Sequence, residues 1–461
     1  PLNAFSRCEM TLIEGELYFI RDRQPSAMSV AAAAQSARPE PLSFPTREIR
    51  EKQLDLSLAP DRKYALVGAT LHPVDAPDVP AGTLLIQGDR ITAIGAQVEV
   101  PSGMRVIDAS GLHVYPGMID AGTVLGLIEI GKVRETHDYQ EAGQFQPDLR
   151  AGVAVNPDSE LIPVTRAGGI TASLVRPAGG IISGQGSLIK LDGWTVPEMT
   201  LNYEAALQID WPGGNDNQPR IEQLRDFLEE GRNYARLKVA AAAAQTTPPV
   251  QDPRYEALGP YLRGEKPVFI EANSRKDIAE ALLFAEKEKL KLVITGGADA
   301  WKLAPELKKR QVPVIVGAVM TRPHDEHDVF DAPYANPGRL HEAGVTFCIR
   351  SNATSTAGFS ASNSRNAPFE AAQAVAYGLP VAEALKALTQ YPARILGVED
   401  QMGTLSPGKL ANLVITDGSP LQPSTQYKAI FVAGRPYPPE SRHTQLYQKY
   451  RARLLEVRSR P

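Results

Sequence analysis

Cysteine is almost absent from this sequence. Its 461 residues include two cysteines, Cys8 and Cys348, which are too few for a disulfide framework or for a cysteine-rich zinc site. Histidine is also sparse, with seven residues in the chain. Any metal site would therefore have to be built from a few histidines and from carboxylates.

The sequence also has no excess of positive charge and no long apolar run. Lysine and arginine total 49 against 53 aspartates and glutamates, a formal net charge of −4. Domains that hold nucleic acid by bulk charge carry a basic excess, so this class of function is excluded. No stretch approaches the roughly 18 uninterrupted apolar residues of a membrane-spanning helix, so we expect no membrane span.

The chain has an ordinary globular composition, with 43% hydrophobic and 22% charged residues. Its length fits one large domain and one smaller one. From residue 116 to 399, short apolar strands alternate with longer helical patterns. This alternation predicts an α/β fold, a (β/α)8 TIM-like barrel with parallel strands. Short strands at 61–115 and 400–440 flank the barrel, and we predict that they meet as one composite β-sandwich domain.

Two short segments resemble each other at a constant offset of 419 residues, and each has the pattern of a strand entering a glycine turn. The identical pairs are Pro1 and Pro420, Leu2 and Leu421, Gly15 and Gly434, and Tyr18 and Tyr437. Chance similarity is one explanation. The other is that residues 1–24 are the terminal strands of a preceding homologous domain, which makes this chain the rear part of a tandem.

The remaining segments are a linker and a tail. Residues 25–60 are rich in Ala, Pro, Ser and Gln, which is typical of a linker. Residues 441–461 predict a helix with one apolar face, docked either on its own barrel or on a partner. The chain begins at Pro1 without Met, which we interpret as a processing site or a boundary. The linker favours a periplasmic or secreted location, and the sequence does not otherwise fix the compartment.

Three runs resemble the metal-dependent amidohydrolase superfamily. Residues 114–121 (VYPGMIDA) resemble the entry to its first barrel strand, and residues 391–398 (YPARILGV) with 403–414 (GTLSPGKLANLV) resemble its exit into the β domain. Residues 265–278 (EKPVFIEANSRKDI) are similar to the strand-five region of the imidazolonepropionase-like branch. The resemblance implies a barrel with an attached β-sandwich and, in working members, hydrolysis of a C–N bond by one or two divalent metals, which supply hydroxide near neutral pH.

The resemblance also implies where metal ligands should stand, and the ligands are missing there. The two strand-one histidines fall at Gly122 and Val124, the strand-five histidine at Asn273 and the strand-six histidine at Gly296. The strand-eight aspartate, which takes a proton from water in working members, falls at Asn352, whose amide cannot act as a base near neutral pH. We therefore predict a degenerate member with no metal or other cofactor in this chain, and expect zinc or another divalent ion only in an active partner.

Three functions remain open. The first is a non-catalytic structural or regulatory subunit or domain, in an oligomer with an active amidohydrolase homologue possibly encoded in the same precursor. The second is a hydrolase with an unorthodox site at His324, Asp325 and His327, whose His-x-x-His spacing is also compatible with a solvated acidic loop. The third is a small-molecule binding module whose emptied pocket offers polar contacts. The candidate contacts are Gln185, Glu271 and Arg350.

Overall fold

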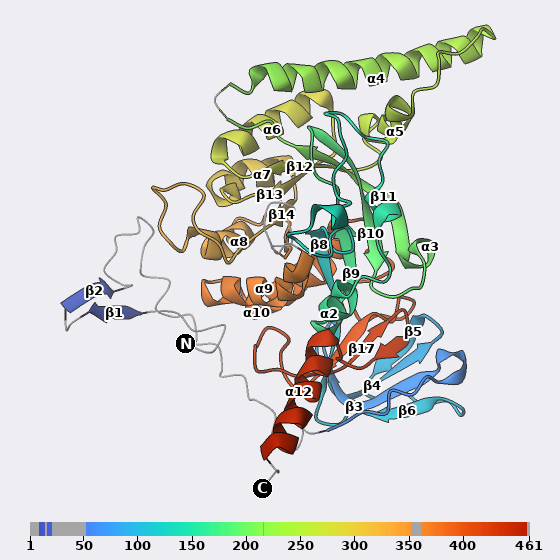
Figure 1. Cartoon of the computed structure of the whole chain (residues 1–461), viewed down its shortest axis with the longest axis vertical. Coiled ribbons are helices and arrows are strands. Elements are labelled where there is room, and N and C mark those ends of the chain that lie inside the picture. The colour runs from blue at the N-terminus through green and yellow to red at the C-terminus, as the bar shows by residue number, and fades with distance from the viewer. Residues whose placement is uncertain (1–8, 14–15, 21–51, 215, 352–360, 459–461) are drawn as a thin grey trace.

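The computed structural model describes residues 9–13, 16–20, 52–214, 216–351 and 361–458. Two large sheets dominate it, a barrel in the middle of the molecule and a second sheet at one end (Figure 1). The predicted fold class, a TIM-like barrel with a β domain built from both flanking segments, is confirmed.

The barrel sheet runs in the order β8-β9-β10-β11-β12-β13-β14-β15. Asp120 of the first strand accepts hydrogen bonds from Ser351, directly after the last strand, which brings the two edges of the sheet together. The strand bounds are β8 Met118–Thr123, β9 Ile170–Val175, β10 Ile182–Lys190, β11 Thr200–Asp210, β12 Val268–Ala272, β13 Leu292–Gly296, β14 Val314–Val316 and β15 Phe347–Ile349.

One barrel strand departs from the expected parallel arrangement. β10 pairs antiparallel with both β9 and β11, whereas the other barrel strand pairs are parallel. The connections on either side of β10 span residues 176–181 and 191–199. These are too short for the helical crossover that a parallel neighbour needs, so the chain reverses direction at each one.

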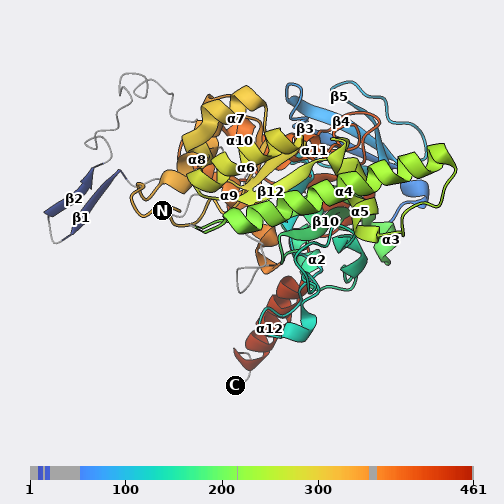
Figure 2. The same cartoon turned by 90° about the horizontal axis from the view of Figure 1, so that it is seen from above.

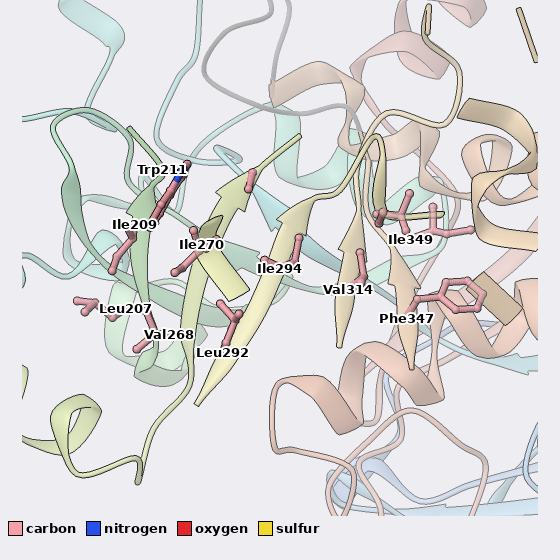
Figure 3. Close-up of a cluster of buried hydrophobic side chains, with 14 of the residues drawn as sticks. Leu207, Ile209, Trp211, Val268, Ile270, Leu292, Ile294, Val314, Phe347 and Ile349 are labelled. Carbon is pink, nitrogen blue, oxygen red and sulfur yellow. The ribbon is translucent and has the colours of Figure 1, made fainter. Parts of the chain in front are cut away.

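Apolar side chains on the outer faces of the barrel strands pack against the helices. Figure 3 shows this layer, with Val268 and Ile270 of β12 beside Leu292 and Ile294 of β13. The helices are α2 Leu161–Ala167, α3 Val196–Met199, α4 Gln218–Ala244, α5 Pro253–Leu262, α6 Arg275–Glu288, α7 Ala304–Arg310, α8 Ala332–Glu342, α9 Ala367–Ala376, α10 Val381–Leu388, α11 Gln390–Ile395 and α12 Arg442–Arg458. Among the described residues, none of the helices combines the length and apolarity that a bilayer crossing requires.

The inner faces of the same strands form a second, narrower core. Its members include Ile119, Leu174, Phe269, Ile315 and Cys348. Because side chains alternate along a strand, the residues two positions further along point into the same interior, nearer its carboxyl end. That end of a barrel is where functional side chains normally gather.

The second sheet joins segments from before and after the barrel. Its order is β18-β17-β16-β7-β3-β4-β5, with β6 paired to β3. The bounds are β3 Tyr64–Leu71, β4 Val79–Gln87, β5 Arg90–Gly95, β6 Arg105–Asp108, β7 His113–Pro116, β16 Leu413–Thr416, β17 Tyr427–Val432 and β18 Arg435–Tyr437. The joint is the antiparallel pairing of β16 with β7, which precedes the barrel directly.

Two peripheral elements complete the structure. β1 (Met10–Ile13) and β2 (Glu16–Ile20) form a two-stranded antiparallel sheet of their own, and both views place it apart from the barrel (Figures 1 and 2). The tail forms helix α12, as predicted. At its start, Arg442 Nη1 lies 3.5 Å from Oε1 of Glu160, the residue that precedes α2. Tyr450 and Leu454 further along α12 are exposed, so the choice between docking on the barrel and docking on a partner stays a prediction.

Candidate functional site

Three charged side chains meet inside the carboxyl end of the barrel. Glu271 of β12 lies two residues after Phe269 and points into the interior. Arg176 follows β9 directly and Arg350 follows β15 directly. The strand order alone would separate these three strands, but the nearly closed sheet brings their ends together.

The two arginines hold the glutamate from both sides. Arg176 Nη1 donates to Glu271 Oε2 at 2.7 Å, and Arg350 Nη2 donates to Glu271 Oε1 at 2.8 Å. The Thr295 hydroxyl donates to the same carboxylate at 2.8 Å. Arg350 is 2% exposed, so this is a buried cluster whose geometry matters more than that of a surface ion pair. We refer to Arg176, Glu271, Thr295 and Arg350 as the mouth cluster.

The two guanidinium groups govern the charge state of Glu271. Burial opposes ionisation of Glu271, but the Arg350 and Arg176 guanidinium groups more than offset it and hold the pKa of Glu271 well below its usual range. Asp210, at the end of β11, has its pKa raised by burial, which its more distant partner Arg176, 4.0 Å away, offsets only in part. Glu271 is therefore the ionised partner of the two arginines.

Glycines make room for the mouth cluster. A Cβ at Gly122 would lie 3.0 Å from Cδ and 3.1 Å from Nη1 of Arg350, and one at Gly317 would lie 2.6 Å from its Nε. A Cβ at Gly296 would overlap the Asn273 side chain and lie 2.7 Å from Glu271 Oε1, and its φ of +82° also favours glycine. Side chains at these three positions would thus compete with the cluster for the same space.

Two further carboxyl groups of the barrel domain, those of Asp120 and Glu370, are buried. Asp120 accepts from the Ser351 hydroxyl at 2.5 Å and from its amide at 3.1 Å, and burial raises the pKa of Asp120 to about 6. Glu370 of α9 accepts a hydrogen bond from the Met320 amide at 2.6 Å, and burial raises the pKa of Glu370 to about 7. Both carboxyl groups fasten the backbone that follows a barrel strand.

The Glu370→Gln variant should be more stable than the wild-type chain at alkaline pH and close to it at pH 5. The folded-state pKa of Glu370 is raised, so its contribution to stability is fully present below the ordinary pKa of 4.5 and is lost as pH rises through about 7. Glutamine keeps an oxygen for the Met320 amide and never ionises. We expect its advantage in free energy of unfolding to grow by roughly 2 kcal/mol between pH 5 and pH 8.5 in urea titrations. The exposed Glu222→Gln is the control, and an advantage that does not change with pH would contradict the assignment.

A cavity of about 570 Å³ opens beside the mouth cluster. Its charged walls are Arg176, Asp210, Glu271 and Asp277, with Asn273 and His324 at its edge. A larger cavity, about 830 Å³, lies at the opposite end of the strands between Lys266, Leu292 and Arg394. We take the smaller one as the candidate site, because the carboxyl end of a barrel is where its loops and charged side chains converge.

The positions at which the resemblance places metal ligands do not all lie at the barrel mouth. Gly122, Asn273 and Gly296 do lie around the mouth cluster. Val124, by contrast, is buried in the layer between barrel and helices. Asn352 lies outside the described residues.

The other predicted contacts separate into different places. Glu271 and Arg350 bind each other directly. Gln185 does not join them, because its amide donates to the Pro147 carbonyl and accepts from the Tyr261 hydroxyl. Sequence reasoning missed Arg176 and Thr295, although a charged residue directly after a buried strand was a usable signal for the first.

The alternative histidine site is only partly assembled. His324 reaches the edge of the cavity. Asp325 accepts from the backbone amide of His327 and lies 3.7 Å from Lys302, so its carboxylate is engaged locally. His327 itself is exposed.

The residues of the barrel mouth do not fit the divalent metal that the family resemblance implies. In the part of the chain that the structure describes, no three His, Cys, Asp or Glu side chains are grouped so that they could hold an ion. The one carboxylate at the centre, Glu271, is already bound by two guanidinium groups. A divalent cation at this carboxylate would either displace the two guanidinium groups or lie close to their positive charges, which repel it. The arrangement therefore supports no metal-dependent step.

Comparisons with known proteins agree with this architecture. The family model described as amidohydrolase family matches residues 284–439. Imidazolonepropionase of Symbiobacterium thermophilum is 28% identical over 390 residues, covering 74% of this chain and 85% of that protein. Amidohydrolase tasK of Hapsidospora irregularis is 24% identical over 383 residues, covering 74% of this chain but 38% of that protein, so the chain spans well under half the length of this relative.

Among solved structures, an amidohydrolase from Thermotoga maritima superimposes with a TM-score of 0.74 at 26% identity, covering 81% of this chain and 99% of that one. A Xaa-Pro dipeptidase, at 15% identity and a TM-score of 0.51, shares the fold. Together, the family model, the imidazolonepropionase and the Thermotoga structure show that this chain is similar to amidohydrolases in sequence and in fold.

Proposed function

We propose that this chain is an amidohydrolase-type domain that works without a metal, as a non-catalytic structural or regulatory unit beside an active homologue. The observation that carries the proposal is the mouth cluster. Two buried guanidinium groups within 2.8 Å of Glu271 take up the charge and the space of a metal centre. Arginine remains charged at any physiological pH, so this arrangement does not release its carboxylate for an incoming cation.

The glycine at residue 122 supports the same proposal. Working members of the family, by resemblance, carry a histidine there. In this chain the Arg350 side chain lies so close that even a Cβ would press on it. A histidine at residue 122 and Arg350 in its present position would therefore compete for the same space.

The partner in the proposal is an active homologue because the fold remains intact while the metal site does not. The described core of the barrel is continuous from β8 to β15, and a cavity persists at its mouth. The region similar to amidohydrolase tasK makes up 38% of that protein, so a relative exists in which such a unit is joined to more chain. A unit of this kind can contribute a surface or a brace to a neighbouring domain without chemistry of its own.

Hydrolysis assays of the purified chain test the proposal. We expect no turnover of N-acyl amides, dipeptides or cyclic amides above that of the Glu271→Gln variant, with or without added zinc, because two guanidinium groups already hold the carboxylate at the centre of the described barrel mouth. Zinc-stimulated hydrolysis that the wild-type chain shows and Glu271→Gln lacks would overturn it. The His327→Ala variant covers the alternative site, and activity lost in that variant alone would favour a hydrolase acting through His324 and His327.

A further inference from the structure

The isolated β1–β2 hairpin matches the hairpin that ends the second sheet. The two segments carry the same glycine and tyrosine at an offset of 419 residues, Gly15 with Gly434 and Tyr18 with Tyr437. At that offset, β1 Met10–Ile13 falls on residues 429–432 of β17, and β2 begins where β18 begins. The repeat in sequence is thus also a repeat in secondary structure.

The pairing of the two hairpins agrees next to the turn. Ile13 pairs with Glu16 and Leu12 with Leu17. The corresponding pairs of the second hairpin are Val432 with Arg435 and Phe431 with Pro436, each shifted by 419. One pair further on, an irregularity in β1 shifts the register, so that Thr11 pairs with Phe19 whereas Ile430 pairs with Tyr437. The two hairpins thus share the two cross-strand pairs nearest the turn.

The β17–β18 hairpin is stabilised by pairing with a third strand. β17 pairs with β18 on one side and with β16 on the other, and its residues from Ala429 to Val432 are fully buried. A two-stranded hairpin is at best marginally stable alone, so this third strand supplies much of its stability. Among the described residues, β1 pairs with no strand other than β2.

The glycine that the two segments share is Gly434 in the second hairpin, where it lies in a turn that packs closely against its own sheet. Gly434 has a φ of +75°, and a Cβ there would overlap the carbonyl oxygen of Gly88 in the β4–β5 turn. Its amide donates to the Ala411 carbonyl at 3.1 Å, and the Ala433 amide donates to Asn412 Oδ1 at 2.7 Å. This glycine turn is therefore shaped to press against the β4–β5 turn and residues 411–412 of its own sheet.

We propose that the β1–β2 hairpin is the closing hairpin of a second sheet domain of the same type, which lies on the N-terminal side of this chain in the same polypeptide. β1 pairs there with a strand equivalent to β16. A second copy of this chain is not the partner, because its β16 is already paired on both sides, with β7 and β17. The inference rests on the proposed function in identifying the partner as a homologue.

Hydrogen exchange of the natural polypeptide tests the proposal, with the residues 1–461 chain as its comparison. In the shorter chain, the amides of residues 10–13 and 16–20 should exchange rapidly while those of β17 are protected. With the natural upstream sequence present, we expect the hairpin amides to exchange at least about tenfold more slowly. Equal exchange in both proteins, or a coding frame whose upstream part encodes no sheet domain of this type, would overturn the inference.

A pair of glycine variants separates this result from general instability. In the residues 1–461 chain, Gly434→Ala should lower the melting temperature, whereas Gly15→Ala should leave it unchanged. In the longer polypeptide, Gly15→Ala should destabilise the upstream domain, and a failure to do so would count against the docking. Metal binding or hydrolysis by this chain would contradict the proposed function but would not change any of these outcomes, so the two failures are distinguishable.

Discussion

Replacing Arg350 with methionine is expected to lower the free energy of unfolding by about 3–5 kcal/mol at pH 7, the range found when one partner of a buried ion pair is removed. Arg350 is 2% exposed and its guanidinium donates to Glu271 at 2.8 Å. Methionine fills a similar volume but leaves the glutamate with one cation instead of two. Urea titrations at constant pH measure the change.

Substituting Glu271, the partner of Arg350, tests whether the loss of stability comes from charge. In the Arg350→Met background, Glu271→Gln should restore part of the lost stability, because it removes the carboxylate that the substitution left underpaired. Since the loss of Arg350 raises the pKa of Glu271, the deficit of the single variant should also be smaller at pH 4 than at pH 7. The surface pair of Arg254 and Asp252, 2.7 Å apart, is the control, and Arg254→Met should cost less than about 1 kcal/mol. A small effect of Arg350→Met, or no rescue by Glu271→Gln, would contradict the role given to the mouth cluster.

Restoring the histidine that the family resemblance implies at residue 122 should also destabilise the chain. A Cβ at Gly122 would lie 3.0 Å from Arg350 Cδ and 3.8 Å from Arg176 Cδ, and an imidazole extends further into the same space. Overpacking of this kind costs about 1–3 kcal/mol. The measurement is the unfolding free energy of Gly122→His in the wild-type and Arg350→Ala backgrounds.

The two backgrounds distinguish crowding from other causes. If Arg350 is the obstacle, histidine at 122 should cost at least about 1 kcal/mol less once Arg350 is alanine, since substitutions in contact are not additive. Equal costs in both backgrounds would mean that Gly122 and Arg350 are unrelated. The exposed Ala243→His, on α4, controls for the effect of adding a histidine at all.

The sequence predicted the architecture well because its strongest signals are local. The alternation of strands and helices between residues 116 and 399 and the short strands on either side of it follow from hydrophobic period and turn chemistry, and the structure contains both. The reversed direction of β10 was not predictable in the same way. The apolar pattern of a strand is the same whichever way the strand runs in the sheet. Only the short connections at the two ends of β10 indicate that it runs antiparallel to its neighbours.

The candidate site was predicted in part. Glu271, Arg350 and Gln185 were named as polar contacts of one pocket, but nothing local in the sequence reveals that Glu271 and Arg350 bind each other. Nor does the sequence reveal that Gln185 is engaged by Pro147 and Tyr261. The pairing of β10 with β11 is irregular on both sides of Gln185, and the face on which a side chain lies cannot be counted across such irregularities.

In our proposal, the two arginines and the glycines around them occupy the barrel mouth in place of a metal centre. A divalent ion draws anionic and imidazole ligands together at the ends of several strands. In this chain Arg176 and Arg350 bind Glu271 from opposite sides and tie β9, β12 and β15 at the same place. These contacts would hold the ends of the three strands together without a metal ion, as the proposed structural or regulatory unit requires.

The central claim is most directly tested by counting the metal bound to the purified chain. We expect inductively coupled plasma mass spectrometry, after incubation with excess zinc and gel filtration, to find far less than one ion per chain and no difference between wild type and Glu271→Gln. One zinc per wild-type chain, lost in Glu271→Gln, would place a metal in the barrel mouth and contradict the account.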